Sequence, residues 1–325
     1  MKVAINGFGR IGRVFFKRAI EKGINIVAIN DRSDIKTLAY LLKYDSVYGV
    51  YDKKIEVGKN FIKVAGKKIL ILSEDNPEKL PWKDMGVDVV IESTGVFTDR
   101  EGAGKHLTAG AKKVVITAPA KNPDVTIVFG VNEKELKKNH KIISLASCTT
   151  NCIAPVIKIL DDAFGIRKGY MTTIHAYTND QNILDSFHRN TRRARAGAIN
   201  LIPTTSGATK SVSEVIPNLK GKLDGMAIRA PVACGSITDF VATLNKSVTA
   251  EEINKIMKNK AEKIKDVLEY TEDEIVSSDI IGNSHSSVFD SKLTKANGNM
   301  IKILSWYDNE HGYSCRMVDL IKILK

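Results

Sequence analysis

Short apolar runs alternate with amphipathic stretches along the first half of the chain. One run covers residues 3–5 and a second covers residues 24–29. Between them, apolar side chains from Ile11 to Ala19 recur at helical spacing, which predicts a helix with one buried face. Similar apolar runs follow at residues 87–91, 114–116 and 141–146. Strands that alternate with helices in this way predict an α/β domain built on a parallel, doubly wound sheet.

The second half of the chain follows a different pattern. Apolar residues recur at helical spacing over residues 153–164, and shorter, strand-like runs follow. These runs cover residues 171–175, 239–244 and 299–305. Residues 181–200 are polar and lack periodicity, which predicts a long loop. We therefore expect an α+β domain with a mixed or antiparallel sheet over residues 148–311, after a first domain over residues 1–147.

The first apolar run leads into a glycine-rich turn, Gly7-Phe8-Gly9-Arg10-Ile11-Gly12. Gly7 permits a tight turn, Gly9 lets the backbone approach a pyrophosphate, and Gly12 lets the following helix pack closely. A pyrophosphate would bind at the start of that helix, where backbone N–H groups are unpaired. Asp31 lies about 20 residues further on, where a carboxylate binds ribose hydroxyls. The turn therefore predicts a Rossmann-type dinucleotide-binding domain.

Asp31 also bears on the choice of cofactor. A carboxylate at this position repels the 2′-phosphate of NADP, so NAD is the predicted cofactor. The neighbouring Arg32 can accept that phosphate. We therefore expect NAD to be preferred and NADP to be used to some extent.

Cys148 stands where a predicted strand ends and a predicted helix begins. Its neighbours are polar, with Ser147 before it and Thr149 and Thr150 after it. Unpaired N–H groups at a helix start carry partial positive charge, which favours a thiolate. A free cysteine is more often a small buried apolar residue, and the polar neighbours argue against that alternative. We therefore predict that Cys148 is a nucleophile.

Two features of the second half are suited to anions. Residues 203–210 have the composition of a helix start rich in hydroxyl groups, with Ser206 and Gly207 at its centre. Such a start can bind an anion, and an ordinary N-cap is the alternative. Arg229 lies in a second candidate segment, a predicted strand. Arginine suits phosphate because its planar guanidinium binds two phosphate oxygens at once.

The bulk properties of the chain exclude several classes of protein. Its 325 residues allow two domains, and 43% hydrophobic residues is ordinary for a globular protein. No apolar run approaches the roughly 20 residues of a membrane helix, and no signal-peptide pattern is present. Four cysteines without framework spacing favour a reducing compartment such as the cytoplasm. No zinc-ligand spacing follows the cysteines, so no metal is expected.

The net charge of +12 raises the question of a nucleic-acid partner. The lysines are scattered, however, and the arginines concentrate only at Arg192, Arg193 and Arg195. Without a basic motif interleaved with aromatic residues, no dedicated nucleic-acid partner is expected. A basic, nucleic-acid-binding protein with a vestigial enzyme fold is the rival from another class. Salt-dependent binding of an oligonucleotide would support that rival.

The segment Ala146-Ser147-Cys148-Thr149-Thr150-Asn151-Cys152 resembles the active-site signature of phosphorylating glyceraldehyde-3-phosphate dehydrogenases, and matching segments cover nearly the whole chain. The resemblance implies NAD-dependent conversion of D-glyceraldehyde 3-phosphate and inorganic phosphate to 1,3-bisphosphoglycerate through a cysteine thioester. It also implies a homotetramer, with residues 181–200 as an S-shaped loop at a subunit interface. A C-terminal helix, 312–325, is expected to pack on the first domain. The glycolytic and gluconeogenic directions both stay open.

The resemblance assigns roles to individual residues. Cys148 and His175 are the expected catalytic residues, with His175 taking the thiol proton. Substrate and inorganic phosphate are expected to bind Ser147, Thr149, Thr178, Arg193, Ser206, Gly207 and Arg229. The cofactor is expected to contact Gly7, Gly9, Arg10, Ile11, Gly12, Asp31, Thr94, Gly95, Thr117, Asn309 and Tyr313.

Several positions depart from the family pattern. Asp75 lies in a segment where the family usually has Arg before Asp-Pro, and Ser186-Phe187 replaces the Leu-Pro that is common in the bacterial NAD-dependent members. Both departures bear on cofactor preference, so an NADP-preferring gluconeogenic form is one alternative. His311 replaces the usual Trp, and the sequence does not explain that change.

A sister dehydrogenase that acts on erythrose 4-phosphate is the nearest enzymatic rival. It resembles this chain in the cysteine signature but usually lacks Thr-Asn after the histidine segment, and it usually lacks the Ser/Thr-Gly-Ala anion site. This chain has both Thr178-Asn179 and Ser206-Gly207-Ala208. Both segments favour the triose substrate.

Overall fold

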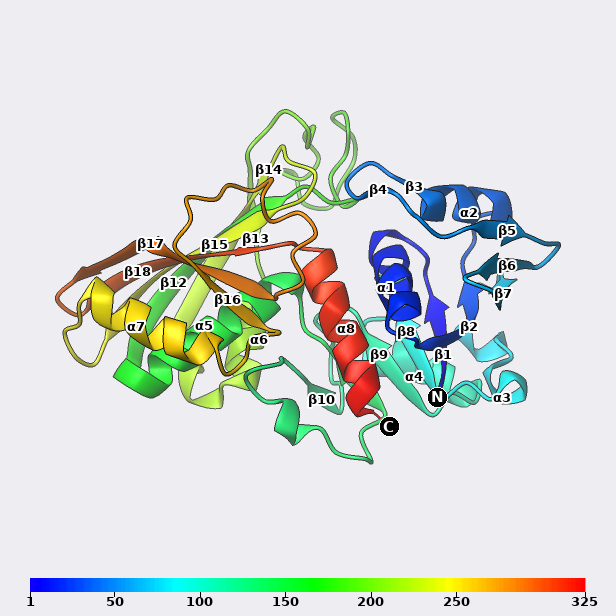
Figure 1. Cartoon of the computed structure of the whole chain (residues 1–325), viewed down its shortest axis with the longest axis horizontal. Coiled ribbons are helices and arrows are strands. Elements are labelled where there is room, and N and C mark those ends of the chain that lie inside the picture. The colour runs from blue at the N-terminus through cyan, green and yellow to red at the C-terminus, as the bar shows by residue number, and fades with distance from the viewer. Residues whose placement is uncertain (325) are drawn as a thin grey trace. The chain divides into compact units, whose positions relative to one another are not determined.

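The computed structural model describes residues 1–324, which divide into two compact units (Figure 1). The first unit contains residues 1–127, residues 134–146 and the C-terminal stretch from Ser314 onward. The second unit contains residues 128–133 and 147–313. Each unit is built around its own large sheet.

The sheet of the first unit has nine strands in the order β10-β11-β9-β8-β1-β2-β7-β6-β5. Its strands are β1 (Lys2–Asn6), β2 (Asn25–Asn30), β5 (Ile55–Val57), β6 (Phe61–Val64), β7 (Lys67–Leu72), β8 (Val89–Glu92), β9 (Lys113–Ile116), β10 (Val125–Thr126) and β11 (Ile142–Ser144). The strands from β10 to β7 are parallel, whereas β6 and β5 extend the edge in antiparallel fashion. From β1 the chain proceeds to β2 on one side and later to β8 on the other. The predicted doubly wound, Rossmann-type sheet is confirmed.

The shorter elements of the first unit lie between these strands, except for one C-terminal helix. They are α1 (Arg10–Glu21), α2 (Ile35–Lys43), the pair β3 (Tyr44–Asp45) and β4 (Gly49–Val50), η1 (Pro77–Lys79), α3 (Trp82–Met85), α4 (Arg100–Thr108), η2 (Glu133–Glu135) and α8 (His311–Ile323). Helix α8 contributes its residues from Ser314 onward to this unit, and its first residues belong to the second unit, as does Glu133 of η2. The antiparallel edge was not predicted, because charged residues such as Lys63, Lys67 and Lys68 interrupt its apolar pattern. Charged side chains are typical of edge strands.

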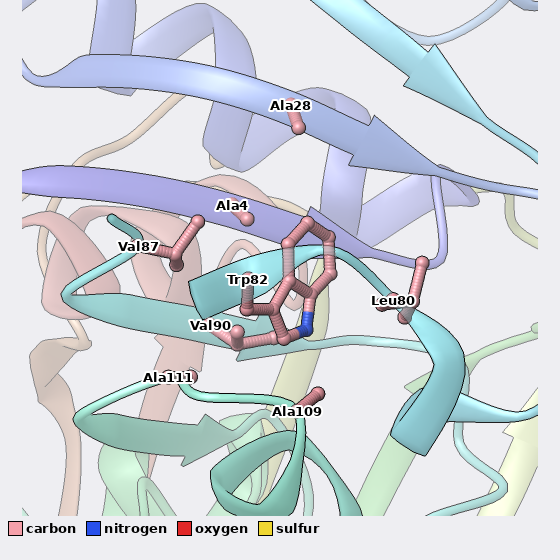
Figure 2. Close-up of a cluster of buried hydrophobic side chains, with 8 residues drawn as sticks. All are labelled: Ala4, Ala28, Leu80, Trp82, Val87, Val90, Ala109 and Ala111. Atoms are coloured by element: carbon pink, nitrogen blue, oxygen red, sulfur yellow. The ribbon is translucent and has the colours of Figure 1, made fainter. Parts of the chain in front are cut away.

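Trp82 fills part of the core of the first unit. Its side chain is fully buried, and small residues on neighbouring strands, Ala4 of β1 and Ala28 of β2, leave room for it (Figure 2). The indole Nε1 donates a hydrogen bond to His106 Nδ1 at 3.0 Å. An indole N–H can only donate, so the His106 ring is neutral and carries its proton on Nε2.

A buried carboxylate fixes the strand ends on which the cofactor turn depends. Glu92, at the end of β8, accepts hydrogen bonds from Asn6 Nδ2 at 2.6 Å and from His106 Nε2 at 3.0 Å. It also accepts from the Thr94 backbone N–H at 2.8 Å and from the Thr94 hydroxyl. A buried charge is tolerated only when its hydrogen-bonding capacity is satisfied, as it is here. Glu92 therefore holds the ends of β1 and β8 together directly before the glycine-rich turn.

The sheet of the second unit has seven strands in the order β13-β14-β12-β15-β18-β17-β16. Its elements are α5 (Cys148–Phe164), β12 (Ile166–Ala176), β13 (Ile202–Thr205), α6 (Ala208–Val215), η3 (Pro217–Leu219), β14 (Leu223–Ala230), β15 (Ser236–Leu244), α7 (Ala250–Ala261), β16 (Leu268–Thr271), β17 (Ser287–Asn297) and β18 (Met300–Tyr307). Two strand pairs, β12–β14 and β16–β17, are parallel, and the others are antiparallel. The predicted mixed sheet is confirmed, while α7, β16 and β17 were not predicted.

The alternation of side chains along β12 places the site histidine on the buried face of the sheet. Met171, Thr173 and His175 are buried, while Thr172 and Ile174 between them are only half-buried. Successive residues of a strand point to opposite faces, so these three share one face. Helix α5 packs against β12, which brings the start of α5 to the same strand as His175.

Candidate active site

Cys148 is the first residue of α5, directly after a turn with unusual backbone geometry. Ala146 has a φ of +52°, a left-handed conformation that non-glycine residues rarely adopt. Ser147 is the N-cap of α5, and its hydroxyl oxygen accepts a hydrogen bond from the Thr150 N–H at 3.0 Å. The predicted position of Cys148, between a strand and a helix start, is confirmed. The Ser147 side chain, predicted to bind substrate, caps the helix.

His175 lies against Cys148 although 27 residues separate them in the chain. The Cys148 Sγ is 3.5 Å from His175 Nε2. On the other side of the ring, His175 Nδ1 is 2.7 Å from Arg229 Nη1 and 2.6 Å from the Ala176 carbonyl oxygen. The structure thus brings together the thiol, the imidazole and one of the two predicted phosphate-binding arginines.

Burial and charge set the protonation of this pair. Burial raises the pKa of the Cys148 thiol, while the Arg229 charge, a hydrogen bond with the Thr149 side chain and nearby backbone N–H groups act in the opposite direction. Burial, together with the Arg229 charge, lowers the pKa of His175 to about 3. At neutral pH these two shifts leave the pair as a thiol beside a neutral imidazole.

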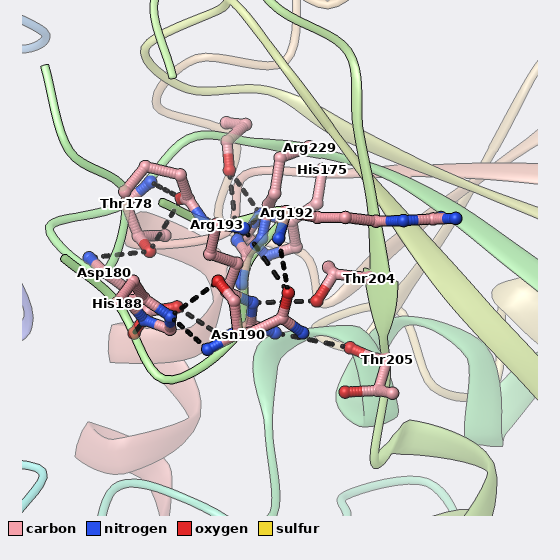
Figure 3. A network of polar contacts seen from close by, with 12 residues as sticks. His175, Thr178, Asp180, His188, Asn190, Arg192, Arg193, Thr204, Thr205 and Arg229 are labelled. Carbon is pink, nitrogen blue, oxygen red and sulfur yellow. Dashed lines mark hydrogen bonds and ion pairs between the residues drawn. The ribbon is translucent and has the colours of Figure 1, made fainter. Parts of the chain in front are cut away.

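The second predicted phosphate-binding arginine is held by its own partners (Figure 3). Arg193 Nε donates to the Thr204 hydroxyl at 2.8 Å, and Arg193 Nη1 forms an ion pair with Asp180. The backbone N–H of Asn190 donates to His188 Nδ1 at 2.9 Å, so His188 carries its proton on Nε2. His188 Nε2 then donates to Asp180 Oδ1 at 3.2 Å. Asp180 and His188 therefore orient Arg193, and neither was singled out from the sequence.

The hydroxyl groups predicted for the anion sites are placed differently from one another. The Thr178 N–H and hydroxyl both donate to Gln181 Oε1, at 2.7 and 3.3 Å. Ser206 lies before α6, where its hydroxyl accepts from the Ala208 N–H at 3.3 Å. Gly207 is the N-cap of α6 and provides no capping side chain. The Thr149 hydroxyl instead points into the unit, where it lies 2.8 Å from the Tyr307 hydroxyl.

The glycine-rich turn after β1 has the geometry that the sequence predicted. Gly7 has a φ of +91°, and a Cβ there would lie 2.7 Å from the Thr94 nitrogen. A Cβ on Gly12 would overlap the Gly7 carbonyl oxygen, so α1 packs on the turn only because residue 12 is glycine. A Cβ on Gly9 would meet nothing within 4 Å. The surface beside Gly9 is therefore open, and no side chain caps α1.

Asp31 lies beside this turn, as predicted from its position after β2. Its carboxylate accepts hydrogen bonds from the Phe8 N–H at 2.7 Å and from the Ser33 N–H at 2.9 Å. The neighbouring Arg32 forms an ion pair with Asp75, with Nε 2.6 Å from Oδ1. Arg32 and Asp75, which both bear on cofactor preference, therefore neutralise each other's charge. Both side chains are largely exposed, at 82% and 71%.

The other residues predicted to bind cofactor lie in two places. Arg10 is the first residue of α1 and pairs with Asp45 at 2.9 Å, and Ile11 follows it. Thr94, Gly95 and Thr117 lie at or beyond the carboxyl ends of β8 and β9, within the first unit. Asn309 and Tyr313 belong to the second unit, where Asn309 Oδ1 accepts from the Ser236 hydroxyl at 3.0 Å and Tyr313 is buried.

Residues 1–324 contain neither a metal-binding cluster nor a helix suited to a membrane span. No group of three or more His, Cys, Asp or Glu side chains in this range is arranged to hold a metal ion. None of the helices in the same range combines the length and apolar character that a membrane span requires. The four cysteines are free, and all but Cys148 are buried.

A Rossmann-type unit joined to a unit with a thiol–imidazole pair is the architecture of an NAD-dependent oxidoreductase. Residues 1–100 match the family model for the NAD binding domain of glyceraldehyde 3-phosphate dehydrogenase, and residues 147–309 match the model for its C-terminal domain. The chain belongs to the glyceraldehyde-3-phosphate dehydrogenase family. NAD is accordingly its cofactor.

Curated relatives of the same name are similar over nearly their whole length. Glyceraldehyde-3-phosphate dehydrogenase from Borreliella burgdorferi is 56% identical over 333 aligned residues, which cover 100% of this chain and 99% of the relative. The protein of that name from Geobacillus stearothermophilus is 55% identical, with 98% of this chain and 97% of the relative covered. The one from Thermotoga maritima is 55% identical, with 99% and 98% covered.

Proposed function

We propose that the chain catalyses the NAD-dependent oxidation and phosphorylation of D-glyceraldehyde 3-phosphate to 1,3-bisphosphoglycerate, in glycolysis or gluconeogenesis. The observation that carries this proposal is the 3.5 Å contact between Cys148 Sγ and His175 Nε2 at the start of α5. A thiol with an imidazole in reach can lose its proton as it attacks a carbonyl carbon. We assign cofactor binding to residues 1–147 with 312–325 and substrate binding to residues 148–311.

The residues of the second unit account for each step. When the substrate phosphate draws Arg229 off His175 Nδ1, Nδ1 carries the ring proton and donates it to the Ala176 oxygen, which leaves Nε2 free to accept. Cys148 Sγ then attacks the aldehyde carbon and its proton passes to His175 Nε2. The oxyanion that forms is stabilised by His175 Nε2–H and the Cys148 backbone N–H. NAD held by Gly7, Gly9, Gly12 and Asp31 would supply the hydride acceptor, and loss of the hydride from the adduct would leave an acyl thioester on Cys148. Inorganic phosphate attacks the acyl carbon, the Cys148 thiolate leaves, and the product is an acyl phosphate.

The reaction brings two phosphate groups to the site, one on the substrate and one that attacks the thioester. Arg193 and Arg229 supply two guanidinium groups, and the hydroxyls of Thr178 and Ser206 supply neutral hydrogen bonds. Arg229 Nε is buried and has no hydrogen-bond partner among residues 1–324. A buried donor without a partner favours a ligand that accepts from it. We assign both arginines to phosphate binding.

The turn between β1 and α1 fits the cofactor. The space beside Gly9 admits a pyrophosphate close to the backbone, and no side chain occupies the start of α1. One carboxylate oxygen of Asp31 accepts a hydrogen bond from the Phe8 N–H at this turn. The negative charge there would repel the 2′-phosphate of NADP. Gly7, Gly9, Gly12 and Asp31 would therefore hold NAD.

The decisive assay is formation of NADH from glyceraldehyde 3-phosphate, with and without phosphate or arsenate. We expect turnover to require one of these two anions. We expect Cys148→Ser to abolish turnover and still bind NAD, whereas Cys315→Ser, a change of another free cysteine, should keep activity. Turnover in Cys148→Ser, or a rate indifferent to phosphate, would contradict the proposal. Faster turnover of erythrose 4-phosphate would favour the sister dehydrogenase instead.

We also propose that the protein is a cytoplasmic homotetramer. Loop residues of the second unit expose large apolar side chains: Ile183, Leu184, Phe187, Ile199 and Leu201. Phe187, the most exposed of the five, is 88% exposed. Clusters of exposed apolar side chains are typical of protein interfaces. A reactive thiol also requires a reducing compartment. Light scattering should give four times the chain mass, and the mass of a single chain would contradict the assembly.

A further inference from the structure

A tyrosine behind the thiol–imidazole pair connects the two elements that carry it. The hydroxyl of Tyr307, at the end of β18, lies 2.8 Å from the Thr149 hydroxyl and 2.9 Å from the Thr173 hydroxyl. Thr149 follows Cys148 in α5, and Thr173 precedes His175 by two residues on β12. The Tyr307 ring also packs edge-on against the His175 ring, with centroids 5.9 Å apart. Tyr307 is 1% exposed, so no bulk water competes for these contacts.

The sheet explains how one side chain reaches both elements. Strand β15 lies between β18 and β12, and Tyr307 is paired with Ser236 on β15. Ser236 is small, so the Tyr307 side chain can extend over β15 toward β12. The next buried position of β15 along this face is Thr238, which is paired with Thr173. The small residues of β15 therefore leave the space that the phenol ring occupies.

The donors in this cluster can be assigned from their neighbours. Burial raises the pKa of Tyr307 well above its usual range, and the Cys148 charge acts in the same direction, so the phenol keeps its proton. The Thr149 side chain hydrogen-bonds Cys148, and this bond lowers the pKa of the thiol. When Thr149 donates to the sulfur, its oxygen is free to accept from the Tyr307 hydroxyl. The Thr173 hydroxyl has two acceptors in reach, the Tyr307 oxygen at 2.9 Å and the Ile237 carbonyl oxygen at 3.3 Å, and it donates to the nearer one, Tyr307.

We propose that Tyr307 is a positioning residue that stabilises the Cys148 thiolate through the Thr149 hydroxyl. In this arrangement Thr173 donates to Tyr307, Tyr307 donates to Thr149, and Thr149 donates to the sulfur. Hydroxyl groups in such a chain polarise one another, so the last one becomes a better donor to an anion. The chain matters most when the sulfur is negatively charged, which occurs before attack and again when the thiolate leaves. The proposal rests on the proposed function of Cys148.

Other groups that face the sulfur also affect the protonation of the Cys148 thiol, so the test variants must leave them unchanged. They come from α5, β12, β14 and α8, and they are Cys152, His175, Arg229 and Tyr313. Substitutions that remove only a hydroxyl leave all of these in place. Tyr307→Phe keeps the ring that packs on His175, and Thr149→Val keeps the volume of the threonine.

The test is the rate at which iodoacetamide alkylates Cys148 in the full-length protein as a function of pH. We expect Tyr307→Phe to move the midpoint upward by about one pH unit, with the rate at high pH unchanged. At neutral pH this shift is about a tenfold lower rate. Thr149→Val should give a similar shift, and Thr149→Ser, which keeps the hydroxyl, should restore the wild-type midpoint. The double variant should shift no further than either single variant, because the two groups act in one chain.

The matched control is Tyr51→Phe, which removes another buried hydroxyl, one without a hydrogen-bond partner among residues 1–324. It should keep the wild-type midpoint. A wild-type midpoint in Tyr307→Phe would overturn the inference, as would a lower plateau at an unchanged midpoint, which indicates general disorder. If Tyr307→Phe fails to fold, the midpoint of the alkylation rate in Thr149→Val tests the inference by the same criterion. Full NADH formation after alkylation of Cys148 in the wild type would instead refute the proposed function.

Discussion

The Arg229 guanidinium lies between two acceptors at the end of β12, with Nη1 at 2.7 Å from His175 Nδ1 and at 3.2 Å from the Ala176 carbonyl oxygen. A guanidinium can only donate, so Nδ1 accepts and the ring proton is on Nε2, which faces Cys148. Nδ1 and the Ala176 oxygen are themselves 2.6 Å apart. An anion that draws Arg229 away would let Nδ1 take a proton and donate it to this oxygen.

Replacing Arg229 should therefore raise the pKa of His175. The Arg229 charge is the second cause, after burial, of the low pKa of this ring, about 3. In a Cys148→Ser background, which excludes the thiolate, we expect Arg229→Leu to raise the pKa by about one unit or more. The ring signals in NMR titrations report the change directly. Inorganic phosphate added to the Cys148→Ser protein should shift the pKa in the same direction, and a fall in either titration would contradict this account.

The same substitution at two glycines of the cofactor turn should affect different properties, stability at Gly12 and NAD binding at Gly9. Gly12→Ala places a methyl group against the Gly7 carbonyl oxygen, so it should lower the free energy of unfolding by about 3 kcal/mol. The methyl group of Gly9→Ala would meet nothing within 4 Å, so this variant should change the free energy of unfolding by less than about 1 kcal/mol. Because Gly9 faces the predicted pyrophosphate, Gly9→Ala should weaken NAD binding about tenfold or more.

Urea unfolding and NAD titration of both variants separate the two effects. The variants control for each other, since each adds one methyl group within the same turn. A Gly9→Ala variant that binds NAD like the wild type would place the pyrophosphate elsewhere.

The elements that bear the site were predictable because their signals are local. The apolar run of β1, the glycines after it and the helical spacing of α1 are contiguous in the chain. The same holds for β11, Cys148 and α5. The pairing of Cys148 with His175 could not be read from spacing, because it depends on α5 packing against β12. Only the resemblance to a family indicated it.

The features that sequence reasoning missed depend on contacts in space. Glu92 reads as a surface residue, and its burial is possible only because Asn6, His106 and Thr94 converge on it. Asp180 lies in an irregular loop without periodicity, so its ion pair with Arg193 left no pattern. The family resemblance predicts that Thr149 binds an anion, and its contact with the Tyr307 hydroxyl left no pattern in the sequence because the two residues are far apart in the chain.

Removing the Asp75 charge should increase the use of NADP. Asp75 pairs with Arg32 at the exposed surface, and without it the arginine is available to a 2′-phosphate. Exposed ion pairs contribute up to about 1 kcal/mol, so Asp75→Asn should raise the ratio of kcat/KM for NADP over NAD by about two- to fivefold. Asp162→Asn, which breaks another exposed pair, with Lys158, is the matched control. An unchanged ratio in Asp75→Asn would show that Arg32 does not contact the cofactor.

His175 should make the protein less stable as the pH falls. Its pKa is about 3 in the folded protein and about 6.5 in an unfolded chain. Between these values the unfolded chain binds a proton that the folded one does not, so stability rises with pH across this window and falls on acidification. From about pH 7 to about pH 5 the stability lost through this group is about 2 kcal/mol.

Urea unfolding at both pH values tests this. The free energy of unfolding of His175→Asn should fall by about 2 kcal/mol less than that of the wild type. Cys148→Ser keeps the imidazole and should lose as much as the wild type, whereas equal losses in all three proteins would mean that His175 is protonated in the folded state.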